Sequence, residues 1–106
     1  MFKALIFIHR KPGVSEAEFR RHWREVHGPK AARIPGLVRY VQNHRPRDAT
    51  GKTPFCDGIA EMWYADEATY RGSRESPEAR AAVADLDAFV DRARIVYLFV
   101  DEETVA

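Results

Sequence analysis

Four histidines are the side chains of this sequence best suited to chemistry near neutral pH, because their ordinary pKa is near ~6.5. They are His9, His22, His27 and His44. His27 follows an apolar helical pattern and directly precedes Gly28-Pro29, so the sequence places it at the C-terminal end of a helix. The helix dipole favours the protonated imidazole there, whereas burial favours the neutral form. His27 is therefore our candidate general acid or base, and a structural C-cap is the alternative.

The remaining histidines are weaker candidates. His22 falls within the apolar stripe of the same predicted helix, which indicates a partly buried structural residue. His9 ends the first predicted strand and His44 ends the second, and residues at the ends of strands often line the mouth of a cleft. We therefore expect His9 and His44 to contact a ligand, although both positions are also common in plain turns.

The spacing of these side chains does not favour a metal site. His22 and His27 are five residues apart, which is about 500° around an α-helix, so we expect them on different sides of it. No cysteine or acidic residue completes a zinc-binding spacing, and Cys56 is the single cysteine. The sequence also has no glycine-rich phosphate loop and no dinucleotide fingerprint. We predict no bound cofactor and no metal, while a mononuclear site built from distant histidines stays open.

Aromatic side chains are numerous for a chain of this length, and three of them are candidates for the walls of a ligand pocket. Trp23 shares the face of the predicted helix that His27 borders, Tyr40 lies in the second predicted strand, and Trp63 lies in the third. A flat apolar ligand would suit such walls. The alternative interpretation is that these rings belong to an ordinary hydrophobic core.

Capping residues and turns predict the elements that must position these side chains. The predicted helices start at the capping residues Ser15, Asp66 and Ser76, and we expect them to end near His27, Gly72 and Val90. The predicted strands cover 2–9, 37–45, 58–64 and 94–101, with a loop over 46–54. The order β-α-β-β-α-β predicts an α+β protomer of the ferredoxin-like kind, with an antiparallel sheet and its helices on one face.

Both faces of the first and the last predicted strand are apolar. In the first strand Phe2, Ala4, Ile6 and Ile8 alternate with Leu5 and Phe7, and the last strand shows the same two-sided pattern. Helices on one face leave the other face uncovered, and large apolar patches are rare on soluble monomers. We therefore predict a homodimer in which a second copy covers that face.

The composition limits the other partners. The 106 residues fit a single domain covering 1–106, and the 17 basic residues are balanced by 16 acidic ones, which does not favour nucleic-acid binding. The longest apolar run, at 4–8, is too short to span a membrane, and the N-terminus has no signal-peptide pattern. With one cysteine no internal disulfide forms, and we expect a cytoplasmic protein.

Three segments of the sequence carry motifs of a known family. The run 19–29, Phe-Arg-Arg-His-Trp-Arg-Glu-Val-His-Gly-Pro, is similar to the F-x-x-x-W-x-x-x-H-x-P signature of the EthD family, and Pro35-Gly36-Leu37-x-x-Tyr40 continues it. A later Asp85-x-x-x-Phe89-Val90-Asp91 is similar to a second family element. The resemblance implies a dimeric α/β barrel with a cavity between sheet and helices in each protomer. It matches His27 to the motif histidine and Trp23 and Tyr40 to motif aromatics.

The resemblance implies one main function and leaves alternatives. The main one is a cofactor-independent enzyme of the monooxygenase, oxidoreductase or isomerase type, acting on a small cyclic or aromatic metabolite by acid–base chemistry. His27 would move the proton, which requires a placed base in a closed apolar site. The alternatives are a non-catalytic protein that binds such a small hydrophobic ligand, and a haem-binding protein.

Overall fold

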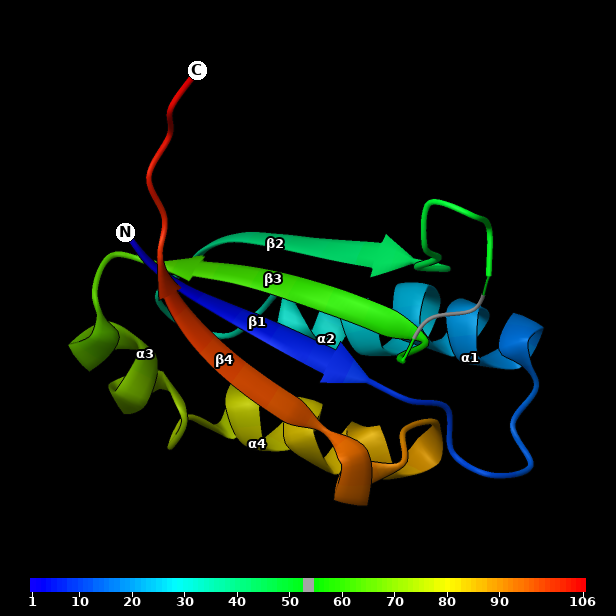
Figure 1. Ribbon diagram of the computed structural model, residues 1–106. Helices are drawn as coiled ribbons and strands as arrows, with labels where there is room; N and C mark the ends of the chain where they lie inside the picture. Colours follow the sequence, from blue (N-terminus) through cyan, green and yellow to red (C-terminus); the bar gives the residue numbers. More distant parts are fainter. Residues whose placement is uncertain (53–54) are drawn as a thin grey trace.

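A computed structural model describes residues 1–52 and 55–106 of the chain, so positions 53 and 54 of the predicted loop lie outside the described residues. Four antiparallel strands form one sheet in the order β2-β3-β1-β4 (Figure 1). The strands are β1 (Phe2–Ile8), β2 (Leu37–His44), β3 (Gly58–Tyr64) and β4 (Val96–Asp101). The sequence of elements and this strand order confirm the predicted ferredoxin-like α+β fold.

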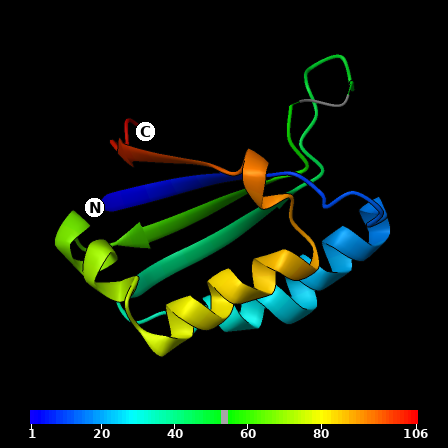
Figure 2. The same ribbon diagram turned by 90° about the horizontal axis from the view of Figure 1, so that it is seen from below.

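The helical segments over 16–31 and 77–85 lie on one face of the sheet (Figure 2). The helical segments are α1 (Glu16–His22), a π-helical turn η1 (Trp23–His27), α2 (Gly28–Ala31), α3 (Glu67–Ser73), α4 (Pro77–Asp85) and the 3₁₀ turns η2 (Leu86–Ala88) and η3 (Arg92–Arg94). The three predicted caps are confirmed: Ser15, Asp66 and Ser76 each accept a backbone N–H bond three residues ahead. These N-cap hydrogen bonds therefore define the first residues of α1, α3 and α4.

The prediction that Gly28-Pro29 ends the first helix is wrong. The N–H of Gly28 donates to the carbonyl of Trp23, five residues earlier, and the chain continues as α2 through Ala31. Pro29 lies in the first turn of α2 and has no N–H to donate, and the wider π-turn before it accommodates the proline without ending the helix. His27 thus lies inside a continuous helical rod rather than at its end.

The last strand is shorter than predicted. The turn η3 occupies 92–94, and the carboxylate of Asp91 caps it by accepting the N–H of Ala93 at 3.3 Å. Strand β4 consequently begins at Val96 instead of Arg94. Its register with β1 still brings Tyr97 opposite Ile6, on the side of the sheet that faces the helices.

The core fills the layer between the sheet and the helices. Its fully buried large side chains are Phe19, Trp23, Tyr64 and Phe89. The opposite face of the sheet carries half-exposed apolar side chains instead, among them Val96 and Leu98. No helix in the described part of the chain is long and apolar enough to cross a membrane.

Candidate functional site

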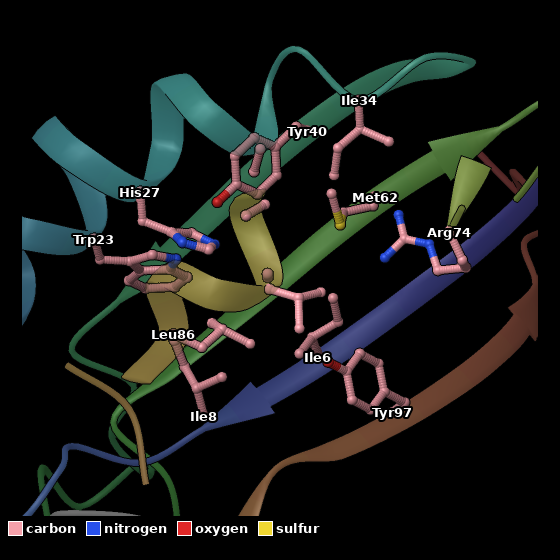
Figure 3. A pocket seen from close by; sticks show the side chains of 14 residues that line it. Ile6, Ile8, Trp23, His27, Ile34, Tyr40, Met62, Arg74, Leu86 and Tyr97 are labelled. Atoms are coloured by element: carbon pink, nitrogen blue, oxygen red, sulfur yellow. The ribbon is translucent and has the colours of Figure 1, made fainter. Parts of the chain in front are cut away.

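A narrow cavity of about 50 Å³ lies inside the protomer, between the sheet and the helices (Figure 3). Its apolar walls include Ile6, Ile8, Ile34, Met62 and Leu86. An apolar cavity of about 150 Å³ admits benzene. A ring can therefore enter this cavity only if the flexible side chains, Met62 and Leu86 foremost, rotate to widen it.

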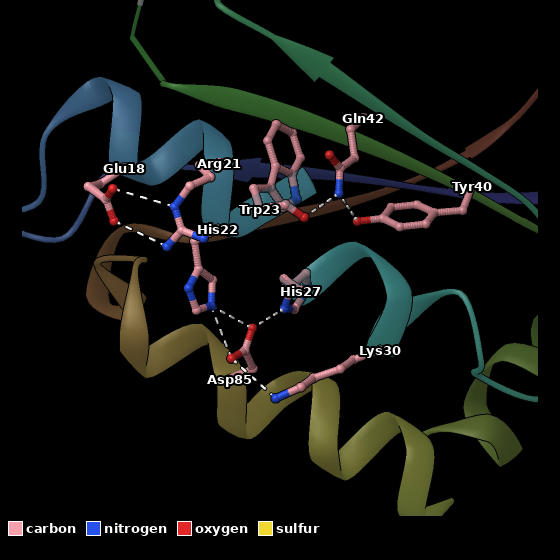
Figure 4. Close-up of polar contacts among 9 residues, drawn as sticks. All are labelled: Glu18, Arg21, His22, Trp23, His27, Lys30, Tyr40, Gln42 and Asp85. Carbon is pink, nitrogen blue, oxygen red and sulfur yellow. Dashed lines mark hydrogen bonds and ion pairs between the residues drawn. The ribbon is translucent and has the colours of Figure 1, made fainter. Parts of the chain in front are cut away.

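His27 lines this cavity and is held by a carboxylate from a distant helix (Figure 4). Its Nδ1 lies 3.0 Å from Oδ2 of Asp85, the last residue of α4. The carboxylate accepts, so Nδ1 carries the proton and Nε2 has the lone pair. Nε2 makes no hydrogen bond with the described residues. This geometry leaves a basic nitrogen available to a ligand.

Burial is the main influence on the protonation of His27. It lowers the pKa of His27 below its ordinary value of 6.5, and the hydrogen bond and charge of Asp85 oppose that change only in part. For Asp85, burial raises the pKa, but the hydrogen bonds from His22 and His27 outweigh burial, so the pKa lies below its ordinary value. At neutral pH the pair is therefore a neutral imidazole beside an ionised carboxylate.

His22 binds the same carboxylate, contrary to the expectation that it and His27 lie on different sides of the helix. Its Nε2 lies 3.0 and 3.1 Å from the two oxygens of Asp85. The physical reason is the π-turn η1, whose hydrogen bonds join residues five positions apart, whereas those of an α-helix join residues four apart. A spacing of five residues, which separates side chains on an α-helix, aligns them here. Lys30 adds a weaker contact to Asp85 at 3.5 Å.

A second set of polar side chains reaches the cavity from β2. Nε2 of Gln42 donates to the hydroxyl of Tyr40 at 2.8 Å and to the carbonyl of Trp23 at 2.9 Å. Oε1 of Gln42 lies 2.8 Å from Nε2 of His44. Tyr40 lines the cavity, and burial raises its pKa, so its hydroxyl stays protonated. Because that oxygen accepts from Gln42, its own proton is free to be donated to a ligand.

His44 itself does not line the cavity. Its ring packs against Trp23 with 4.5 Å between ring centroids, and it reaches the cavity only through Gln42 and Tyr40. Burial, with the positive charges of Arg20 and Arg24, lowers the pKa of His44. A direct contact between His44 and a ligand, as the sequence suggested, does not follow from this placement.

Trp23 forms one wall of the cavity, and only 1% of it is exposed. Its indole lies against Gly58 at the start of β3, where an added Cβ would come within 2.6 Å of the ring. The glycine therefore makes room for the indole. The six-membered edge of the ring occupies the space that any side chain at position 58 would need.

Two of the predicted ligand contacts lie elsewhere. Trp63 alternates with Met62 and Tyr64, so it faces away from the helices, where Lys3 and Arg39 lie over its ring at 4.5 and 4.6 Å. His9 directly follows β1, on the side of the sheet that Leu5 and Phe7 occupy, and does not line the cavity. The structure does not bring Trp63 and His9 to the cavity that His27 lines, and for Trp63 the reason is strand alternation, which puts its ring on the other face of the sheet.

Sequence reasoning also missed residues of the site. In the sequence, Asp85 was identified only as part of the motif at 85–91. Its role as the partner of His27 depends on a contact between residues 58 positions apart in the sequence. Gln42 could have been found, because strand alternation puts it on one face with Tyr40 and His44. Arg74 lines the cavity from the C-cap of α3, and no pattern in the sequence marked it.

The described residues offer little to a metal or a haem group. They contain no group of three or more histidine, cysteine, aspartate or glutamate side chains arranged to hold a metal ion. A porphyrin is many times larger than a cavity of about 50 Å³. Nε2 of His27 would be the nitrogen to bind the iron, but the walls around it leave no room for the porphyrin.

A family model for the EthD domain matches residues 11–93, which include the helical segment from α1 to α2 and His27. The chain belongs to the EthD family. Comparison of the EthD-family sequence with curated proteins gives no significant match.

Solved structures show the same fold. The chain is similar to an EthD-family protein from Bacillus halodurans, with a TM-score of 0.81 at 21% identity, covering 97% of this chain and 100% of the other. It is similar to SnoaB, a cofactor-independent oxygenase from Streptomyces nogalater, with a TM-score of 0.67 at 16% identity over 98% and 95%. A dimeric ferredoxin-like protein from Thermobifida fusca has a TM-score of 0.72 at 17% identity over 95% and 90%.

Proposed function

We propose that this EthD-family protein is a cofactor-independent enzyme that removes a proton from a small cyclic or aromatic metabolite. The observation that carries the proposal is the buried His27–Asp85 pair, which presents an unbonded imidazole nitrogen to an apolar cavity. Family membership and the likeness in fold to a cofactor-independent oxygenase support it.

The proton transfer uses two side chains. Nε2 of His27 takes the proton from a phenol or an acidic C–H bond, and the imidazolium that forms is stabilised by the carboxylate of Asp85. The negative charge left on the substrate oxygen accepts a hydrogen bond from the Tyr40 hydroxyl, which Gln42 orients. Exclusion of water strengthens both interactions.

The same first step serves two outcomes. In an isomerisation the imidazolium returns its proton to a different atom of the substrate. In an oxygenation the electron-rich anion reacts with molecular oxygen as a second substrate. The substrate must be small or must displace Met62 and Leu86, because the cavity is narrower than a benzene ring requires.

The first prediction tests His27. We expect His27→Ala to slow exchange of the acidic C–H proton of a cyclic carbon acid in D₂O by about 100-fold or more, the usual contribution of a general base. The exchange is followed by NMR on a panel of enol lactones, which reads removal of the C–H proton whatever step follows.

A matched control keeps this test specific. His9→Ala removes a histidine outside the cavity and should leave the exchange rate unchanged. Exchange that is equally fast in wild type and His27→Ala would remove the base from the proposal. Binding of the panel without any exchange would favour the alternative, a non-catalytic binding protein.

We also propose that the protein works as a homodimer joined through the outer face of the sheet. That face carries Leu98, 47% exposed, and Phe55, 70% exposed, whose ring lies 5.7 Å from that of Phe7. Within the described part of the chain no helix lies over this face, since α1, α2 and α4 pack on the other side (Figure 2). The structural likeness to a dimeric protein supports the proposal.

A further inference from the structure

Arg74 is a cation at the wall of an otherwise apolar cavity. Apart from His27, it is the only basic side chain among the described residues that line this cavity. Figure 3 shows it across the cavity from His27. Tyr97 of β4 also lines the cavity and is 43% exposed. A ligand that fills the cavity beside His27 would therefore have the guanidinium of Arg74 at its other end.

The guanidinium is held in place by its neighbours. It lies over the ring of Tyr70, 4.7 Å from the centroid. Its Nη2 donates to the hydroxyl of Tyr64 at 3.1 Å and to Oγ of Ser73 at 3.3 Å. Tyr64 and Ser73 are both buried. These contacts fix the plane of the guanidinium in advance, which reduces the entropy lost when a ligand binds it.

The charge of Arg74 has no counter-ion within the described residues. No carboxylate lies within ion-pair distance of it, and its Nη1 donates no hydrogen bond there. Asp85, the acidic group beside the cavity, is already occupied by both histidines and Lys30. The protein therefore leaves the positive charge of this half-buried side chain unneutralised. An anionic group on a ligand would supply the missing partner.

We propose that Arg74 selects a substrate that carries a carboxylate on its ring, held by the guanidinium while the acidic C–H or O–H bond faces His27. The inference rests on the proposed function, of which it specifies the substrate class. A planar guanidinium matches a planar carboxylate better than it matches a point charge, because two parallel N–H groups can bind its two oxygens. Arg74 is thus a residue that determines specificity, and the proton transfer itself belongs to His27.

The test compares two ring compounds of equal size that differ in charge. Their dissociation constants are measured by NMR titration of wild type, Arg74→Gln, Arg74→Lys and Arg80→Gln with 4-hydroxybenzoate and 4-hydroxybenzamide. We expect wild type to bind the carboxylate about 10-fold more tightly than the amide, as for one charge-assisted interaction. Arg74→Gln should abolish this preference, and Arg74→Lys should retain part of it.

The matched control is Arg80→Gln, which removes the same charge from an exposed position on α4 and should keep the full preference. Equal affinity of wild type for the two probes would overturn the role of Arg74, whether or not the variants fold, and would leave proton removal by His27 standing. A preference that survives in Arg74→Gln would overturn it as well. Absence of binding of both probes at millimolar concentration would overturn it together with the proposed cavity.

Discussion

Asp85 is a carboxylate shared by three side chains that are positive or can become so. Its side chain is only 7% exposed, and His22, His27 and Lys30 all contact it within 3.5 Å. A buried carboxylate requires such compensation. Because His22 and Lys30 already provide part of it, His27 can remain neutral without leaving Asp85 unpaired. Because three side chains share the carboxylate, Asp85 can stay ionised while His27 stays neutral and can act as a base.

Replacing Asp85 by asparagine should weaken catalysis and move its pH dependence. An amide can face Nδ1 with either its oxygen or its NH₂ group, so the imidazole loses its fixed tautomer. We expect kcat/KM to fall about 10–100-fold, as when a carboxylate that orients a histidine is lost. The measurement is kcat/KM against pH on a substrate identified by the exchange assay.

The direction of the pH effect follows from the pKa of His27. A base works when neutral, so kcat/KM rises as the pH increases through that pKa, which burial holds below 6.5. Loss of the Asp85 charge removes an influence that raises the pKa, so the rise should move to lower pH. Asp87→Asn, at an exposed position of η2, is the matched control and should leave the profile in place. A rise that moves to higher pH would contradict this account.

At the scale of residues the sequence identified His27 but attributed its properties to the wrong cause. The prediction invoked the dipole at a helix end, whereas the helical rod continues to Ala31 and the influential neighbour is Asp85. That partner comes from α4, and no local pattern reveals a contact between residues so far apart in the sequence. Motif position was therefore more informative than local electrostatics for finding this residue.

Among the elements, the contact between η1 and β3 determines the shape of the cavity. Trp23 reaches across the layer to the beginning of β3, and Gly58 leaves the indole its place. Gly58 also lies beside Ile8, whose Cγ1 would be 3.3 Å from an added Cβ. The strand therefore has no room for a side chain at this point.

Gly58→Ala should destabilise the protein and disturb the cavity. A methyl group 2.6 Å from the indole forces the strand or Trp23 to move, and overpacking of this kind costs about 1–3 kcal/mol. Gly72→Ala is the control: it lies within α3 with no atom within 4 Å, so alanine should stabilise by about 0.5–1 kcal/mol. Urea unfolding monitored by tryptophan fluorescence measures both. Equal effects of the two substitutions would contradict the packing described here.

The helices were predictable at their starts and not at the π-turn. Caps are local signals. The side chains of Ser15, Asp66 and Ser76 accept the backbone N–H three residues ahead, and such residue types are visible in the sequence. A π-turn leaves no such signal, because helical periodicity is analysed with 3.6 residues per turn. The expected separation of His22 and His27 was the direct consequence of that assumption.

For the molecule as a whole, the sheet is the element that remains half covered. Its inner face holds the core and the cavity, and its outer face exposes apolar side chains of β4 at its edge. The strand pattern allowed both the fold and this two-sidedness to be predicted, since alternating apolar residues are visible in the sequence. The side occupied by Trp63 could have been derived from the same alternation.

Leu98→Glu should weaken the proposed dimer. The substitution places a carboxylate on the outer face of each copy, where association would bury it without a partner. We expect the dissociation constant of the dimer to rise about 10-fold or more, as measured by sedimentation velocity at micromolar concentration. Val105→Glu, in the exposed C-terminal tail, is the control and should leave the sedimentation unchanged. A wild type that sediments as a monomer would refute the proposed interface.

The π-turn η1 has a consequence for how this family can change in length. Its turn closes with hydrogen bonds over five residues, so a chain lacking one residue among 24–26 can close the same turn over four as an ordinary α-helix. Two histidines four apart on an α-helix share a face, as this pair does. A one-residue deletion between Trp23 and His27 should therefore preserve the contact of both histidines with Asp85. Aligned relatives with that deletion should keep the aspartate, and their histidine pairs should be counted as equivalent to His22 and His27.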